Sequence, residues 1–167
     1  VYKPQVTQVL RSEVGFRSVG QAVTFQQGQL RTIPEEASML TGDENIVNVQ
    51  FSVQYKISDP VEYLFNVTAP GALVRNAAEA AMREVIAASE LAPILNRDRA
   101  QIAATVQENI QATLDSYQSG INIVRVNLDR ADPPSEVIDA FREVQAAEQE
   151  RDRLQRQADA YANRVLA

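Results

Sequence analysis

The sequence predicts an α+β fold: a small, mainly antiparallel sheet with packed helices, followed by a long C-terminal helix. Three features predict it: one strictly alternating strand, two amphipathic helical stretches, and a final helical run without glycine or proline. We expect the α+β domain over residues 1–131 and the start of a long coiled-coil-like helix over residues 132–167. The 167 residues, 45% hydrophobic and 23% charged, suffice for one folded domain and an appendage.

The central strand is the clearest element. Its apolar residues alternate with polar ones, which is typical of an antiparallel sheet with one buried and one solvated face. These apolar residues are Val47, Val49, Phe51, Val53, Tyr55 and Ile57. Asp59-Pro60 ends the strand because proline cannot donate to the ladder. Before it, residues 41–45 predict a turn, residues 5–14 a strand, and residues 15–36 a hairpin or a long loop.

Helices are expected after this strand. A short helical turn over residues 61–65 precedes Pro70, which suits the first position of a helix with a wide apolar stripe. A second helix is expected to begin at an Asn96 cap and to end with Gly120 as a left-handed C-cap. The strand over residues 121–128 then changes its apolar phase, which indicates either a β-bulge or burial on both faces.

The C-terminal helix is the candidate functional element. Asp132 or Ser135 is expected to cap it, and no stop signal follows before Ala167, so we expect the natural protein to continue further. Its apolar positions recur at steps of three or four, as in a coiled-coil seam, with Ala147 and Arg151 in a weak middle. The candidate assembly interface consists of Val137, Phe141, Val144, Arg151, Leu154, Ala158, Tyr161 and Val165.

The same helix has a second interpretation. It could be a solvated terminal helix folded back on the domain, with charges that serve only solubility. Ion pairs of Glu150 with Arg153 and of Asp152 with Arg156 are expected, each worth about 0.2 to 0.5 kcal/mol, which supports the helix but little tertiary structure.

The composition argues against catalytic and metal-binding chemistry. Without histidine or cysteine, the chain lacks the usual nucleophile arrangements and most zinc sites, so we expect no catalytic residue, no cofactor, no metal and no enzyme activity. Asp43 with Glu44, and Asp129 with Asp132, are expected to serve turns and caps. The net charge of -6 disfavours nucleic acid as a partner. No apolar run reaches the length of a membrane span, so the chain as given is expected to be soluble.

Several motifs resemble the SPFH or band 7 family of stomatins, prohibitins and flotillins. The resemblance covers about residues 37–165 and depends on the order of a turn, a strand, an Asp-Pro stop and a Pro-Pro helix start. The segments that carry it are residues 39–47, 53–60, 63–67, 73–86 and 132–137.

The resemblance implies a membrane-associated scaffold subunit that oligomerises laterally with copies of itself and with a related, HflC-like subunit. It further implies modulation of an FtsH-like membrane AAA protease and attachment through a transmembrane helix upstream of Val1. The implied location is the bacterial inner membrane, with the domain facing the periplasm. Two other functions stay open: a stomatin-like lipid or membrane-microdomain binding module acting alone, and a carboxylate-dependent hydrolase.

Overall fold

The computed structural model describes residues 3–18, 30–96 and 98–165, without the side chains of Leu30 and Phe141. The chain divides into two compact units, Val1–Asp132 and Pro133–Ala167. The first unit combines an antiparallel sheet with packed helices, and the second holds one long helix. The predicted α+β fold is therefore confirmed.

The sheet of the first unit is built around one long strand, β5 (Ile46–Ile57). β6 (Ile121–Asp132) pairs along one side of β5 from Asn48 to Ile57. The other side of β5 is shared by two short strands, β1 (Leu10–Val14) and β4 (Ser38–Leu40). All of these pairs are antiparallel. The turn predicted between β4 and β5 is present.

Between β1 and β4 the chain leaves the sheet. β2 (Phe16–Ser18) pairs with β3 (Leu30–Thr32), and the short helix α1 (Pro34–Ala37) leads back to β4. The predicted hairpin or loop is thus a two-stranded ribbon, whose connecting residues 19–29 lie outside the described residues. Gly15 allows the departure because it has a φ of +82°, and a Cβ there would lie 2.6 Å from the carbonyl oxygen of Val49.

The alternation along β5 produces the expected buried face, since the six alternating apolar residues from Val47 to Ile57 are buried, while Ile46 at the start of the strand is 53% exposed. The opposite face differs from the prediction of a solvated surface. Gln50 is 7% exposed and Ser52 only 1% exposed. The Nε2 of Gln50 donates to the hydroxyl of Thr32 on β3 at 3.0 Å. The β2–β3 ribbon therefore takes part in burying the middle of a face that alternation alone assigns to solvent.

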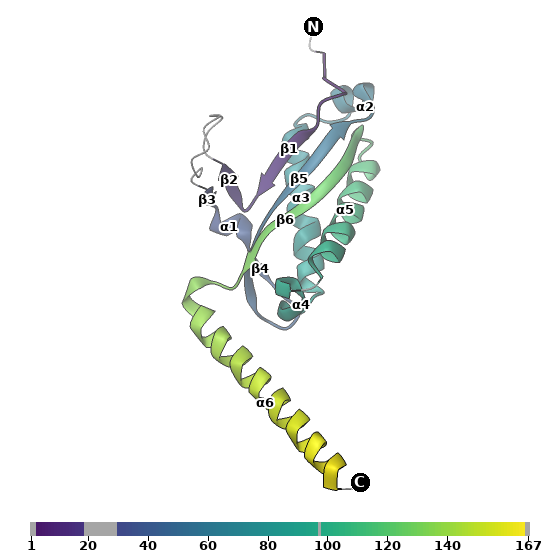
Figure 1. Cartoon of the computed structure of the whole chain (residues 1–167). Helices are drawn as coiled ribbons and strands as arrows, with labels where there is room; N and C mark the ends of the chain where they lie inside the picture. Colours follow the sequence, from purple (N-terminus) through teal and green to yellow (C-terminus); the bar gives the residue numbers. More distant parts are fainter. Residues whose placement is uncertain (1–2, 19–29, 97, 166–167) are drawn as a thin grey trace. The chain divides into compact units, whose positions relative to one another are not determined.

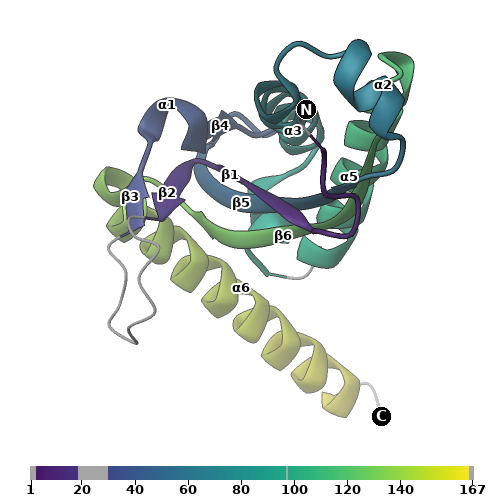
Figure 2. The same ribbon diagram turned by 90° about the horizontal axis from the view of Figure 1, so that it is seen from above.

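Four helices connect β5 to β6: α2 (Pro60–Phe65), α3 (Pro70–Ala87), α4 (Leu91–Asn96) and α5 (Arg99–Ser116). α3 and α5 lie side by side on one face of the sheet (Figures 1 and 2). Both helices contribute fully buried apolar side chains to the core, as the apolar stripes predict. These are Val74, Ala78, Met82, Ile86, Val106, Ile110 and Leu114. The predicted helix start at Pro70 is confirmed.

The predicted caps of α5 are wrong. Asn96 is the last residue of α4, and Asp98 precedes α5 without a side-chain capping hydrogen bond. α4 escapes sequence detection because it is short and contains Pro93, although its first turn tolerates proline. At the other end Gln118, with φ of 47°, follows the C-cap Tyr117, so Gly120 is not needed as the cap.

β6 contains the predicted β-bulge. Pairing with β5 shifts register between Ile123 and Arg125, which leaves Val124 as an extra, exposed residue, and shifts again at Asp129. The change in apolar phase along residues 121–128 is thus explained by a bulge rather than by burial on both faces.

In the second unit, one 3₁₀ turn, Ser135–Val137, leads into α6 (Ile138–Val165). The predicted caps are wrong here as well, because Pro134 precedes the turn and no side-chain cap forms. At about 1.5 Å per residue the 28 residues of α6 extend about 42 Å. Among the described residues, no helix combines the length and the apolar content that a membrane span requires.

Candidate assembly surface

α6 forms because good helix formers make up most of its sequence. Alanine, glutamate, glutamine and arginine dominate the stretch, and it contains neither glycine nor proline. Asp139 lies in the first turn and Arg164 in the last, where each side chain complements the helix dipole. Local sequence preferences therefore favour a helix over the whole of this stretch.

Large apolar side chains of α6 are exposed to solvent. Val144 is 56% exposed, Leu154 53%, Tyr161 64% and Val165 64%. Valine and leucine in this state leave apolar surface in water, which costs free energy unless another surface covers it. Val137, 47% exposed, lies in the turn before the helix. The side chain of Phe141 is outside the described residues.

All candidate interface residues except Phe141, together with Ala147, form two lanes along the 3₁₀ turn and α6. The first lane has a strict spacing of seven residues and consists of Val137, Val144, Arg151, Ala158 and Val165. The second lane holds Ala147, Leu154 and Tyr161, three residues after members of the first. We call these two lanes together the seam. Seven residues make almost two full turns of an α-helix, short by only about 20°, so residues at this spacing lie nearly in line along the helix.

Phe141 departs from this arrangement. Phe141 lies four residues after Val137, whereas each member of the second lane lies three residues after a member of the first. The positions seven and fourteen residues after Phe141 are Glu148 and Gln155, which are polar. The apolar stripe thus changes sides between Val144 and Ala147. This change is the physical reason for the weak middle of the seam.

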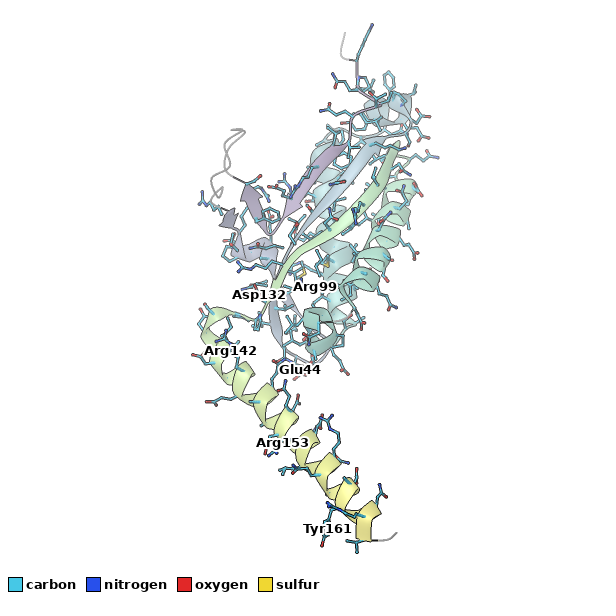
Figure 3. All side chains as sticks on the ribbon, viewed as in Figure 1. Glu44, Arg99, Asp132, Arg142, Arg153 and Tyr161 are labelled. Carbon is cyan, nitrogen blue, oxygen red and sulfur yellow. The ribbon has the colours of Figure 1, made fainter. Side chains whose placement is uncertain are left out.

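Charged pairs lie beside and opposite the seam. Arg153 donates to both carboxylate oxygens of Glu150, at 2.6 and 2.8 Å, and this hydrogen bonding lowers the pKa of Glu150. Figure 3 shows Arg153 and Tyr161 projecting from the helix. The predicted pair of Asp152 with Arg156 is not formed, because Arg156 donates to the backbone carbonyl of Asp152. The Asp152 carboxylate instead lies 3.4 Å from Arg151.

The carboxylates of the first unit have structural roles. Asp43 accepts from the hydroxyl of Thr41 at 2.5 Å and from the backbone N–H of Leu91 at 3.2 Å. The Thr41 hydrogen bond is the main reason why the pKa of Asp43 is lowered. Asp132 pairs with Arg130 at 2.7 Å. Within the described ranges, no group of three or more acidic, histidine or cysteine side chains could hold a metal ion.

One exposed apolar cluster was not singled out from the sequence. On α2, Val61 is 64% exposed, Leu64 41% and Phe65 81%. The signal was available, since four of the six residues of this helix are Val, Tyr, Leu and Phe, whereas a helix on a core normally shows only one apolar stripe. We call Val61, Leu64 and Phe65 the α2 patch.

Comparison with known proteins gives one family match. The model of the SPFH domain / Band 7 family matches residues 3–163. Among the similar proteins is "Protein HflK" of Buchnera aphidicola subsp. Schizaphis graminum, 41% identical over 136 residues, which are 81% of this chain and 33% of that protein. "Protein HflK" of Vibrio cholerae is 40% identical over 137 residues, 82% of this chain and 35% of that protein.

A third relative has a more informative name. "Modulator of FtsH protease HflK" of Escherichia coli K12 is 37% identical over 136 residues, 81% of this chain and 32% of that protein. The chain therefore spans about a third of the length of the relatives it matches.

Proposed function

Because this chain belongs to the SPFH domain / Band 7 family and its relatives are HflK proteins, we propose that it is part of an HflK-like scaffold subunit that acts by lateral assembly. The partners in this proposal are copies of the same subunit and a related, HflC-like subunit. The observation that carries it is the exposed seam of α6, where apolar residues, interrupted in the first lane by Arg151, repeat at a spacing of seven positions.

The seam has the chemistry of a helix–helix interface. Alanines at positions 147 and 158 allow close approach of a second helix, while Leu154 and Tyr161 supply area to bury. Burying one such leucine contributes about 1.5 to 3 kcal/mol. Arg151 adds a charge within the first lane, and such a residue favours partners that offer a carboxylate at the same level. This arrangement supports pairing with a related subunit as well as with an identical one.

The assembled scaffold would modulate an FtsH-like membrane AAA protease without a catalytic reaction of its own. The name of the Escherichia coli relative, "Modulator of FtsH protease HflK", and membership in the family support this part of the proposal. The proposal includes a transmembrane helix upstream of this chain, placement at the bacterial inner membrane and a periplasmic orientation. Control of the protease would then be a matter of enclosure and access rather than of chemistry.

The test uses the full-length, membrane-anchored protein with its related subunit. Leu154→Glu combined with Tyr161→Glu introduces charge into the seam. Gln149→Glu combined with Asn163→Glu adds the same charge about 140° to 160° away around the helix and is the matched control. Large assemblies in detergent should be lost in the first variant and kept in the second, as measured by sedimentation. Unchanged assembly of the seam variant would show that the helix does not hold subunits together.

A second candidate function is supported by the α2 patch. Three exposed apolar side chains on one short helix are suited to contact the apolar part of a lipid surface. The domain would then act as a lipid-binding module on its own. Flotation with zwitterionic liposomes, which do not repel a chain of net charge -6, tests this: Val61→Ser with Phe65→Ser should abolish flotation, whereas Leu40→Ser, at another exposed apolar position, should not. Absence of flotation of the unmodified chain would remove this candidate.

A further inference from the structure

β6 forms an outer edge of the sheet. It pairs with β5 on one side, and none of the described strands pairs with its other side. Figures 1 and 2 show it as the outermost strand beside α5. An exposed strand edge offers unpaired backbone N–H and C=O groups that can pair with another chain.

At the start of this edge, side chains of α5 already form hydrogen bonds with the backbone of β6. The carboxamide of Gln111 accepts from the N–H of Ile123 at 2.7 Å and donates to the C=O of Ile121 at 3.1 Å. Gln107 donates to the C=O of Ile123 at 3.4 Å. The Gln111 amide thus takes the place of a peptide group on a neighbouring strand. These contacts also show that the outward backbone groups of β6 require partners.

Beyond Ile123 the edge is open. The bulges at Val124 and Asp129 enclose four residues, Arg125–Leu128, whose pairing with β5 is regular. Successive residues of a strand alternate in direction, so two of these four point their backbone groups outward. Among the described residues, no hydrogen bond reaches these outward groups from another element. A groove of about 370 Å³ lies between this stretch and α5.

The groove combines an apolar floor with positive charge. Ala100, Ala103 and Ala104 of α5 line it, together with the positively charged residues Arg99 and Arg125. The Nε of Arg99 (Figure 3) is buried and has no hydrogen-bond partner among the described residues. No carboxylate lines the groove, although the chain has a net charge of -6. This local charge favours an acidic ligand.

We propose that this groove binds an extended, acidic peptide segment of a partner protein, which adds to β6 as a further strand. Its backbone would pair with Arg125–Leu128, over about 13 Å, and a carboxylate side chain would meet Arg99 or Arg125. The inference goes beyond lateral assembly through α6 and does not depend on it.

The geometry disfavours the edge of another helix-covered sheet as the occupant. Neighbouring strands lie about 4.8 Å apart, whereas packed helices need about 8 to 10 Å. α5 packs on the sheet beside β6. If the edge strand of a second sheet paired with β6, a helix covering that edge strand would collide with α5. An uncovered, extended segment avoids the collision, and the three alanines of α5 leave room for its side chains.

The test measures binding of a short, blocked peptide that alternates valine with glutamate to the whole chain, by amide NMR shifts and hydrogen exchange. We expect saturable shifts and slowed exchange within Arg125–Leu128. Arg99→Gln with Arg125→Gln should weaken binding about tenfold or more. Ala104→Tyr fills the groove and should abolish binding, while Ala112→Tyr, exposed on the same helix but outside the groove, should not change it.

Two further peptides separate the two parts of the proposal. A peptide with lysine in place of glutamate should bind at least tenfold more weakly because it opposes the arginines. A peptide methylated on alternate backbone nitrogens should not bind, because it cannot pair with the edge. Equal binding of either peptide, shifts outside the groove, or no binding at all would overturn the proposal. Shifts at the same amides that grow with protein concentration alone would assign the groove to a second copy instead.

Discussion

Gly120 joins the end of α5 to the sheet, and its replacement by alanine provides a sharp test of the fold. The residue has a φ of +65°, a conformation that costs an L-residue about 1 to 2 kcal/mol. An added Cβ would also collide with the carbonyl oxygen of Asp59 and lie 2.9 Å from the backbone nitrogen of Tyr63. Both contacts are backbone atoms, which cannot move aside as a flexible side chain could.

The two costs set the expected magnitude. Overpacking against fixed atoms adds about 1 to 3 kcal/mol, so Gly120→Ala should lower the free energy of unfolding by about 3 kcal/mol. The carbonyl of Gly120 also accepts from the N–H groups of Ser58 and Asp59, at 2.8 and 3.1 Å, and any displacement weakens both. With a urea dependence of about 1.5 kcal/mol per M, the unfolding midpoint should fall by about 2 M.

A matched control exists within the chain. Gly71 lies in the first turn of α3, and a Cβ there would meet nothing within 4 Å. Gly71→Ala should therefore leave stability unchanged or raise it by up to about 1 kcal/mol, since alanine is the better helix former. Urea unfolding followed by circular dichroism measures both variants. Equal midpoints for the two variants would refute the close approach of Gly120 to the α2 start.

Two other predictions concern single hydrogen-bonded groups. Gln111→Leu should cost about 1 to 3 kcal/mol and speed amide exchange at Ile123, because the buried edge of β6 loses its side-chain partner; unchanged exchange would contradict the capping role. Burial raises the pKa of Glu36, but hydrogen bonds from Arg17 and Gly15 outweigh it and the pKa is lowered overall. The contribution of the ionised Glu36 carboxylate to the free energy of unfolding is therefore complete above the ordinary pKa of 4.5. It is lost as the pH falls through the lower pKa of the folded state. Glu36→Gln should cost about 1 to 2 kcal/mol at pH 7, and urea unfolding at a series of pH values should show this difference shrinking below about pH 4.5.

Sequence reasoning succeeded where one physical signal dominated. The alternation along β5, the apolar stripe of α3 and the unbroken helical run of α6 each reflect a single local period. It failed where distant segments decide the outcome. The burial of Gln50 depends on Thr32, eighteen residues away, and alternation contains no information about that contact.

Caps were the least predictable features. Asn96 is a good cap residue, but the burial of Leu91 and Ile94 makes a separate short helix of its segment. For the candidate site, the sequence indicated the positions of the seam, and the structure adds that its described apolar side chains are exposed. Whether they contact a second helix stays a prediction. The α2 patch and the β6 groove needed three-dimensional information, since no period in the sequence marks them.

The most direct measurement of the central claim is a photo-crosslinking scan of α6 in the full-length, membrane-anchored protein. Benzoylphenylalanine is placed singly along the seam, at Val144, Leu154, Tyr161 and Val165, and on the opposite side at Gln149, Arg156 and Asn163. If the seam holds subunits together, cross-links to a second subunit should rise at the first set and stay near background at the second. Equal yields at both sets, or higher yields opposite the seam, would contradict assembly through this surface.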